Sequence, residues 1–163
     1  MFNIFKRKPT KNIPPVPSDT DPELRQEFIS ELESAAHKKV NAIDAALVMM
    51  HAGKATIPHL FSALETTPLY NLIKSKDTNN KPLILIHPKG YGTLATFSSP
   101  ERAERTIQQF PEFKEMIEIR LTDILNILSD DTGITINPQY RVAYFNMDPA
   151  QVKQMKEIIQ KTS

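Results

Sequence analysis

A chain of 163 residues can bury a sizeable core but not two large domains, and its 40% apolar and 24% charged residues are typical of a folded globular protein. Twenty basic and nineteen acidic residues leave a net charge of +1, which excludes an overall field that attracts nucleic acid. Because cysteine is absent, disulfides, thiol nucleophiles and cysteine-ligated metals are excluded too.

Residues 1–20 are predicted to be a basic, proline-rich flexible arm. A secretory signal places its basic residues before an apolar run, and here the order is reversed, so we expect a cytoplasmic protein. The apolar residues beside the basic cluster leave two hypotheses open. The arm is either a solvated tail or a weak peripheral membrane contact through Phe2–Lys11.

Residues 21–56 are predicted to form an N-terminal helical segment. Asp21-Pro22-Glu23 is a typical helix start, and apolar residues then recur every three or four positions as far as Met50. One long helix ending at Gly53 is expected, with a break near residues 37–39 as the alternative. An open apolar stripe on this helix would bind a partner protein or a second copy, and its candidate partner-binding residues are Leu24, Phe28, Leu32, Met49 and Met50.

Residues 57–163 are predicted to form an α+β domain. Its first part combines a helix from Ile57, a short helical turn over residues 69–73, and the apolar run Leu83–Ile86. That run is typical of a central strand buried on both faces, and it is expected to form an antiparallel hairpin with the alternating residues Thr93–Phe97.

The second part of this domain continues the same mixture of elements. Ser98 or Ser99 before Pro100 predicts a helix start, and Thr122 or Asp123 predicts the cap of a shorter helix. Strands are expected over residues 117–121, 134–136 and 142–145, and a last helix opens at Asp148-Pro149. The elements show no regular βαβ alternation. They therefore predict an α+β fold, with a mixed β-sheet of about five strands flanked by helices and preceded by an N-terminal helical arm.

Residues 57–160 resemble the N-terminal domain of the SseB family, the enhanced serine sensitivity proteins of bacteria. The likeness lies in the junction of Phe97-Ser98-Ser99 with Glu101-Arg102-Ala103, the strand and short helix over Ile119–Leu128, and the turn Ile134-Thr135-Ile136-Asn137-Pro138. Family members usually have Gly or Ser after Asn-Pro, whereas this chain has Gln139-Tyr140. The resemblance implies a fold and a link to serine sensitivity, with sulfur metabolism as a further link, and it implies no catalytic residue.

Two turns are candidate ligand sites because turns expose backbone N–H groups and polar side chains. The candidate ligand-turn residues are Lys89, Gly90, Asn137, Gln139 and Tyr140. The four histidines lack metal-ligand spacing, and no Ser, Thr or Lys nucleophile is paired with a base by any recognised motif. No catalytic residue, cofactor or metal is therefore predicted, and the sequence leans away from an enzyme.

The net charge of +1 hides a local polarisation, because residues 101–131 carry eight acidic and four basic side chains. An acidic helix face would dock a basic partner or the chain's own basic arm, with a merely solvated face as the alternative, and its candidate residues are Glu101, Glu104, Glu112 and Glu115. The leading hypothesis is a non-catalytic bacterial protein-interaction module that binds a partner protein or itself and no nucleic acid. The alternative is a small-molecule-binding or enzyme-associated protein linked to serine or sulfur metabolism.

Overall fold

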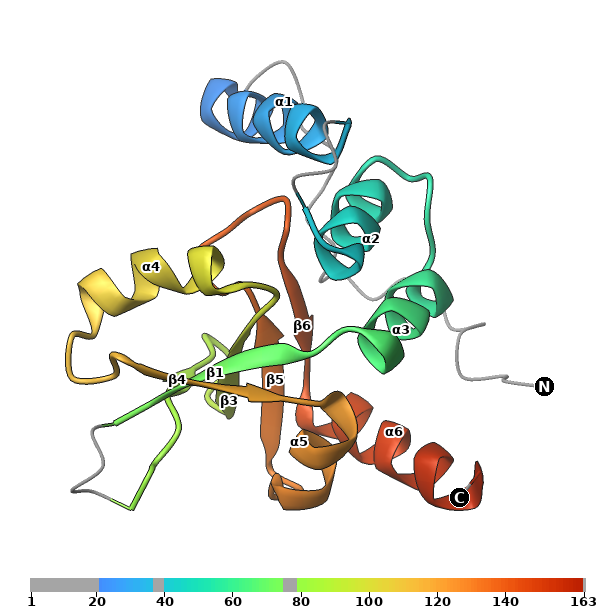
Figure 1. Ribbon diagram of the computed structural model, residues 1–163. Helices are drawn as coiled ribbons and strands as arrows, with labels where there is room; N and C mark the ends of the chain where they lie inside the picture. The colour runs from blue at the N-terminus through green and yellow to red at the C-terminus, as the bar shows by residue number, and fades with distance from the viewer. Residues whose placement is uncertain (1–20, 37–39, 75–78, 163) are drawn as a thin grey trace. The chain divides into compact units, whose positions relative to one another are not determined.

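The structure is a computed structural model that describes residues 21–36, 40–74 and 79–162 (Figure 1). The described residues form six helices and six strands, which confirms the predicted α+β class with its mixed sheet. In chain order the elements are α1 Pro22–Ala36, α2 Ala42–His51, α3 Ile57–Thr66, β1 Leu69–Ile73, β2 Ile84–Ile86, β3 Gly92–Phe97, α4 Pro100–Gln109, β4 Glu115–Ile119, α5 Leu121–Ile127, β5 Thr132–Ile136, β6 Phe145–Met147 and α6 Pro149–Thr162.

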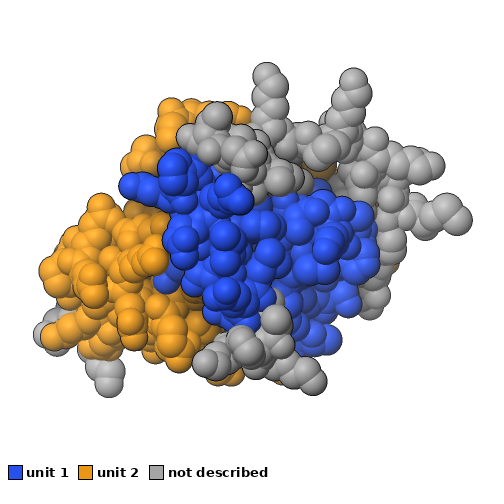
Figure 2. Space-filling view, turned by 90° about the horizontal axis from the view of Figure 1, so that it is seen from above, with its two compact units in different colours: residues 1–67, 140–145 blue, residues 68–139, 146–163 orange. Residues whose placement is uncertain are grey.

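The chain divides into two compact units, coloured separately in Figure 2. The first unit comprises residues 1–67 together with residues 140–145, and the second comprises residues 68–139 and 146–163. The predicted arm over residues 1–20, including the proposed membrane contact Phe2–Lys11, lies outside the described residues. None of the described helices is long and apolar enough to cross a bilayer.

In the first unit the predicted long helix is two helices, as the alternative allowed. The Asn41 side chain accepts a hydrogen bond of 3.0 Å from the Asp44 N–H, so it caps the first turn of α2. A cap satisfies N–H groups that a continuous helix would bond to its preceding turn, and a helix therefore starts at residue 42 rather than continuing from α1. Residues 37–39 lie outside the described residues.

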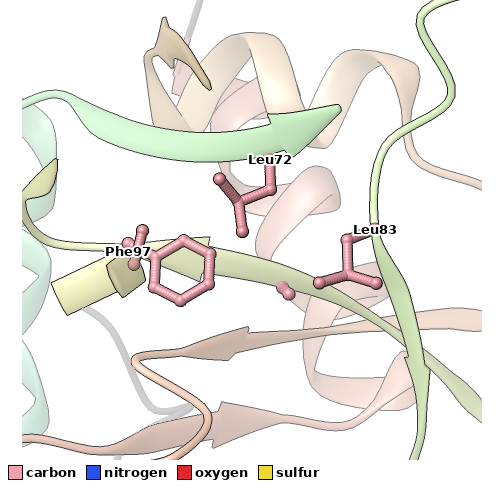
Figure 3. Packing of buried hydrophobic residues seen from close by; sticks show 5 residues of the cluster. Leu72, Leu83 and Phe97 are labelled. Atoms are coloured by element: carbon pink, nitrogen blue, oxygen red, sulfur yellow. The ribbon is translucent and has the colours of Figure 1, made fainter. Parts of the chain in front are cut away.

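The second unit is built on one sheet with the strand order β4-β1-β3-β5-β6. β3 and β5 are parallel, with Leu94 opposite Ile134, whereas β1 pairs antiparallel with both β3 and β4. One face of the sheet carries the buried residues Leu72, Ala95 and Phe97, which pack with Ala103 of α4 (Figure 3). We call it the α4 face, and the other the opposite face.

Residues 69–73 form strand β1, so the prediction of a short helical turn there is wrong. Leu69 and Leu72 are fully buried and Ile73 is 5% exposed, although successive residues of a strand point to opposite faces. A strand that is buried on both faces shows a nearly continuous apolar run, and over five residues such a run also fits helical spacing. Residues 69–73 form a strand because they pair with β3 on one side and with β4 on the other.

The prediction that Leu83–Ile86 is a central strand is also wrong. Among the described residues β2 pairs with β3 alone, and Ile84 and Ile86 are 42% and 75% exposed. The register explains this position, since β1 lies along residues 96–97 of β3 and β2 continues along residues 92–94 on the same side. Between β1 and β2 the Leu83 N–H donates to the Leu72 carbonyl and the Lys74 N–H donates to the Lys81 carbonyl, both at 2.9 Å, and residues 75–78 lie outside the described residues.

Two predicted boundaries shift in the structure, and a third prediction is confirmed. The short helix α5 begins at Leu121 with Arg120 at the cap position, so neither Thr122 nor Asp123 is its cap. The strand predicted over residues 142–145 is β6, Phe145–Met147, because residues 140–144 belong to the first unit, where Val142 enters the core. Ser99 caps α4 as predicted, with its side chain accepting from the Arg102 N–H.

Candidate functional site

The apolar stripe proposed as a docking surface is the interior of the first unit. Leu24 of α1 is 5% exposed and packs with Val48 of α2 and with Val142, and Phe28 and Leu32 pack against this cluster. Met50 is 7% exposed, Phe28 and Leu32 are half-buried, and Met49 is exposed, at 37%. The chain itself therefore buries Leu24 and Met50 and covers Phe28 and Leu32 in part.

A polar clamp holds residues 141 and 142 against α1. One carboxylate oxygen of Glu27 accepts both the Arg141 N–H, at 2.8 Å, and the Val142 N–H, at 3.1 Å. The Arg141 guanidinium donates to Asp21 at 2.7 Å. The pKa of the Asp21 carboxyl is lowered, first by the Leu24 N–H that it accepts and then by Arg141. These charge-assisted bonds fix where Val142 enters the core.

His51 is buried beside this clamp and has an unusual environment. Its side chain is 2% exposed, its ring lies 5.4 Å from the Phe28 ring, and neither ring nitrogen has a hydrogen-bond partner among the described residues. Burial disfavours the charged form and lowers the pKa of the imidazole, and the nearby Glu27 carboxylate opposes this only in part. His51 is thus held neutral in the folded unit.

We expect the first unit to lose stability as the pH falls below the ordinary histidine pKa of about 6.5. In the unfolded chain His51 takes up its proton near its ordinary pKa, whereas the folded pKa is depressed, so the unfolded state binds more protons in this range. Hydrogen exchange of α2 amides across this range measures the effect, and His51→Leu should flatten the pH dependence. An unchanged dependence in His51→Leu would assign it to other groups.

Asn137, predicted as a ligand-turn residue, is a buried structural link. Its side-chain oxygen accepts the Ser98 N–H at 3.0 Å and its amide group donates to the Ser98 hydroxyl at 2.9 Å. Its own N–H donates to the Thr96 carbonyl, and its backbone has φ 52°. Because Asn137 is fully buried, these bonds tie the ends of β3 and β5 together, leaving no ligand-facing group.

The other residues of this predicted site do not gather around Asn137. The Gln139 side chain donates to the Gln109 side chain at the end of α4, and Tyr140 belongs to the first unit. Lys89 and Gly90 lie in the exposed turn between β2 and β3, at the other end of β3 from Asn137. The structure thus does not bring the two predicted ligand turns together.

A buried polar ladder that the sequence did not reveal crosses the second unit. The Thr93 hydroxyl lies 2.7 Å from the Thr135 hydroxyl, Thr135 donates to the side-chain amide oxygen of Asn146 at 2.7 Å, and the Asn146 amide group donates to the Tyr91 hydroxyl at 2.8 Å. Thr135 gives its only proton to Asn146, so Thr93 is the donor to Thr135. The signal in the sequence was a lone polar residue, Asn146, inside an apolar strand.

The ladder ends at the turn between β2 and β3. Tyr91 stacks on His87 with ring centroids 4.5 Å apart, and the His87 Nδ1 accepts the Lys89 N–H at 3.2 Å. Gly90 has φ 90°, which suits glycine, and its N–H donates to the His87 carbonyl. These bonds make the turn a defined structure, with the Lys89 side chain exposed at its tip.

The acidic candidate residues lie on α4 and along the approach to β4. Glu101, Glu104 and Glu112 are exposed, and Glu115 is half-buried at the start of β4. Tyr70 of β1 donates to Glu118 of β4 at 3.3 Å, and its pKa is raised by desolvation first and then by the charges of Glu118 and Glu101. Carboxylates from α4 and β4 therefore both act on one tyrosine, Tyr70. The sequence did not identify Glu118 as a member of this acidic group.

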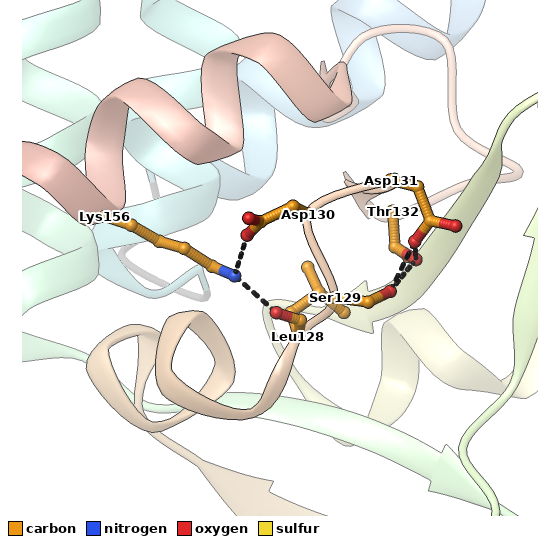
Figure 4. Close-up of polar contacts among 6 residues, drawn as sticks. All are labelled: Leu128, Ser129, Asp130, Asp131, Thr132 and Lys156. Carbon is orange, nitrogen blue, oxygen red and sulfur yellow. Dashed lines mark hydrogen bonds and ion pairs between the residues drawn. The ribbon is translucent and has the colours of Figure 1, made fainter.

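The adjacent carboxylates Asp130 and Asp131 serve a turn between α5 and β5 (Figure 4). Lys156 of α6 donates to Asp130 at 3.0 Å and to the Leu128 carbonyl just past the end of α5. Hydroxyls of Ser129 and Thr132 donate to Asp131 and lower the pKa of its carboxyl. Across the described ranges no group of three or more His, Asp and Glu side chains is arranged to hold a metal ion.

Exposed isoleucines mark the sheet of the second unit. Ile84 and Ile86 of β2 and Ile117 of β4, which is 40% exposed, all lie on the opposite face by their register with β3 and β1. Ile127 of α5 is 72% exposed. Large apolar side chains grouped on one strand at a sheet edge are a feature of protein-binding surfaces.

Comparison with known proteins gives no match to this chain among family models, curated proteins or solved structures. The resemblance to the SseB N-terminal domain thus remains a prediction from the residues quoted above.

Proposed function

We propose that the protein is a non-catalytic protein-interaction module of the bacterial cytoplasm, with the edge strand β2 as its principal binding surface. The observation that carries this proposal is the exposure of Ile84 and Ile86, two residues apart on the same face of β2. In the apolar stripe of α1 and α2, the surface first expected to bind, Leu24 and Met50 are buried within the first unit and Phe28 and Leu32 are partly buried.

The chemistry of β2 specifies the kind of partner. Fully burying an exposed isoleucine contributes about 1.5 to 3 kcal/mol, so Ile86, with the partly exposed Ile84 two residues away on the same face, provides an apolar anchor. The basic Lys89 lies just beyond β2 in the turn, while Glu101 and Glu104 lie on α4 at the other end of β3. A partner protein with an apolar strand or helix face fits β2, and its charges would set its orientation.

A pull-down with three forms of the full chain tests this function. Wild type and the control Ile127→Lys are expected to retain the same specific proteins from an extract of the cells that make it, whereas Ile86→Lys is expected to retain at least about tenfold less, because a buried isoleucine is lost. Ile127 is a matched control since it is equally exposed but lies on α5.

Two results would contradict the proposal in different ways. Equal recovery by Ile86→Lys and Ile127→Lys would exclude β2 as the binding surface. If wild type retains no specific protein, the proposed function as an interaction module is wrong.

A further inference from the structure

We propose that the protein forms a symmetric dimer in which β4 of one copy pairs antiparallel with β4 of a second copy, centred on Met116. The inference goes beyond binding of a partner protein and uses a different strand from β2. β4 is the outermost strand of the order β4-β1-β3-β5-β6, and among the described residues it pairs with β1 alone.

The direction of the backbone groups shows which residues of β4 face outward. The Leu72 carbonyl accepts the Leu83 N–H and the Lys74 N–H donates to Lys81, so residues 72 and 74 point away from β4. Their neighbours Asn71 and Ile73 consequently bond to Ile117 and Glu115, which are their partners in the register. The N–H and C=O groups of Met116 and Glu118 therefore point out of the sheet.

β4 lacks several of the features that usually protect an edge strand, and Glu115 and Glu118 are its only charged residues. Its five residues, Glu115–Ile119, contain no proline and no lysine, and they pair with β1 without a bulge over five consecutive positions. A regular outward-facing row of donors and acceptors is a template for another strand.

Charge then selects a second copy and one register. When Met116 lies opposite Met116 of the second copy, Lys114 lies opposite Glu118 of the second copy, and symmetry repeats this pair. Lys114 and Glu118 are both exposed. A shift by one position to a centre on Ile117 would place Lys114 opposite Arg120 of the second copy, and a centre on Glu115 would place the two Glu115 side chains opposite each other. Both alternatives oppose like charges.

The same register covers an exposed apolar side chain. Ile117 lies opposite Glu115 of the second copy, so the two Ile117 side chains become diagonal neighbours on the opposite face of the joined sheet. Diagonal neighbours are 7 to 8 Å apart between Cα atoms, within reach of isoleucine side chains. The dimer thus buries part of the surface that leaves Ile117 40% exposed in one copy.

Sedimentation of the purified full chain over a range of concentrations tests the dimer. Wild type is expected to shift from monomer to dimer as its concentration rises. Lys114→Glu should weaken the dimer at least about tenfold, because two attractive cross-strand pairs become repulsive. Glu118→Lys should do the same, and the double variant Lys114→Glu/Glu118→Lys should restore association, since it exchanges the two charges of each pair.

The rescue distinguishes this register from any other contact, and both sites are exposed, so the variants are expected to fold. Wild type that stays monomeric at all concentrations overturns the dimer. Association that is unchanged in Lys114→Glu, or not restored in the double variant, overturns the register. Either result leaves the proposed binding through β2 standing, because the pull-down variant Ile86→Lys tests that surface separately.

Discussion

Replacing Asn137 with alanine is expected to lower the free energy of unfolding of the second unit by about 3 kcal/mol. The substitution removes the oxygen that accepts the Ser98 N–H at 3.0 Å and leaves this buried N–H without its partner. An unsatisfied buried donor costs about 1 to 3 kcal/mol. Alanine also tolerates the observed φ of 52° less well than asparagine, which adds about 1 kcal/mol.

Urea unfolding measured for wild type, Asn137→Ala and Asn79→Ala separates these two contributions. Asn79 has φ 59° but is exposed, so its replacement by alanine should cost only the backbone contribution of about 1 kcal/mol. Equal losses in both variants would show that the bonds to Ser98 contribute nothing beyond the backbone conformation. Hydrogen exchange at the Ser98 amide should also accelerate in Asn137→Ala alone.

The second large effect is expected at Gly133, where alanine should destabilise the second unit by about 2 to 3 kcal/mol. A Cβ atom at this position would lie 2.5 Å from the Met147 carbonyl oxygen and 3.1 Å from the Tyr91 ring. The closest atom is backbone, so β6 would have to move away from β5. This movement would also strain the Asn146 to Tyr91 hydrogen bond of 2.8 Å.

Gly92→Ala is the matched control for this prediction, because Gly92 precedes the residue that pairs with Gly133 in the parallel register. A Cβ at Gly92 would meet only the Ile84 side chain, at 3.1 Å, and Ile84 is 42% exposed and can turn aside. Thermal unfolding should therefore separate the two variants by several degrees. Equal melting temperatures would contradict the clash with Met147.

The helix starts that were predicted correctly depend on interactions between residues that are close in the sequence. Ser99 caps α4, and Asp148 and Gln151 exchange bonds at the start of α6 within four residues of each other. Such caps depend on residue type and spacing, so they can be identified before any tertiary structure is known. The α+β class followed from the order of these elements.

The errors concern strands whose position depends on distant residues. The run Leu69–Ile73 is a strand because it lies between β3 and β4, and Leu83–Ile86 lies at an edge because β1 occupies the rest of that side of β3. Apolar periodicity over five residues carries no information about neighbours thirty positions away. The same limit explains why residues 142–144 were predicted as a strand.

The candidate sites show a similar division. Asn137 was singled out by the Asn-Pro turn, but whether its side chain faced solvent or Ser98 depended on the pairing of β3 with β5. The polar ladder joins Thr93, Thr135 and Asn146 from three strands, a juxtaposition that only the sheet order creates. Exposed Ile84 and Ile86 were predicted to be core for the same reason.

The first unit combines residues 1–67 with residues 140–145, so its core cannot be completed early in synthesis. Val142 completes the cluster of Leu24 and Val48, and the N–H groups of residues 141 and 142 donate to the Glu27 carboxylate. On a ribosome, α1 to α3 emerge more than seventy residues before these partners, a delay of several seconds at about 5 to 20 residues per second. During this delay the nascent helices lack Val142, so Leu24 and Val48 cannot complete their apolar cluster until most of the second unit has been synthesised.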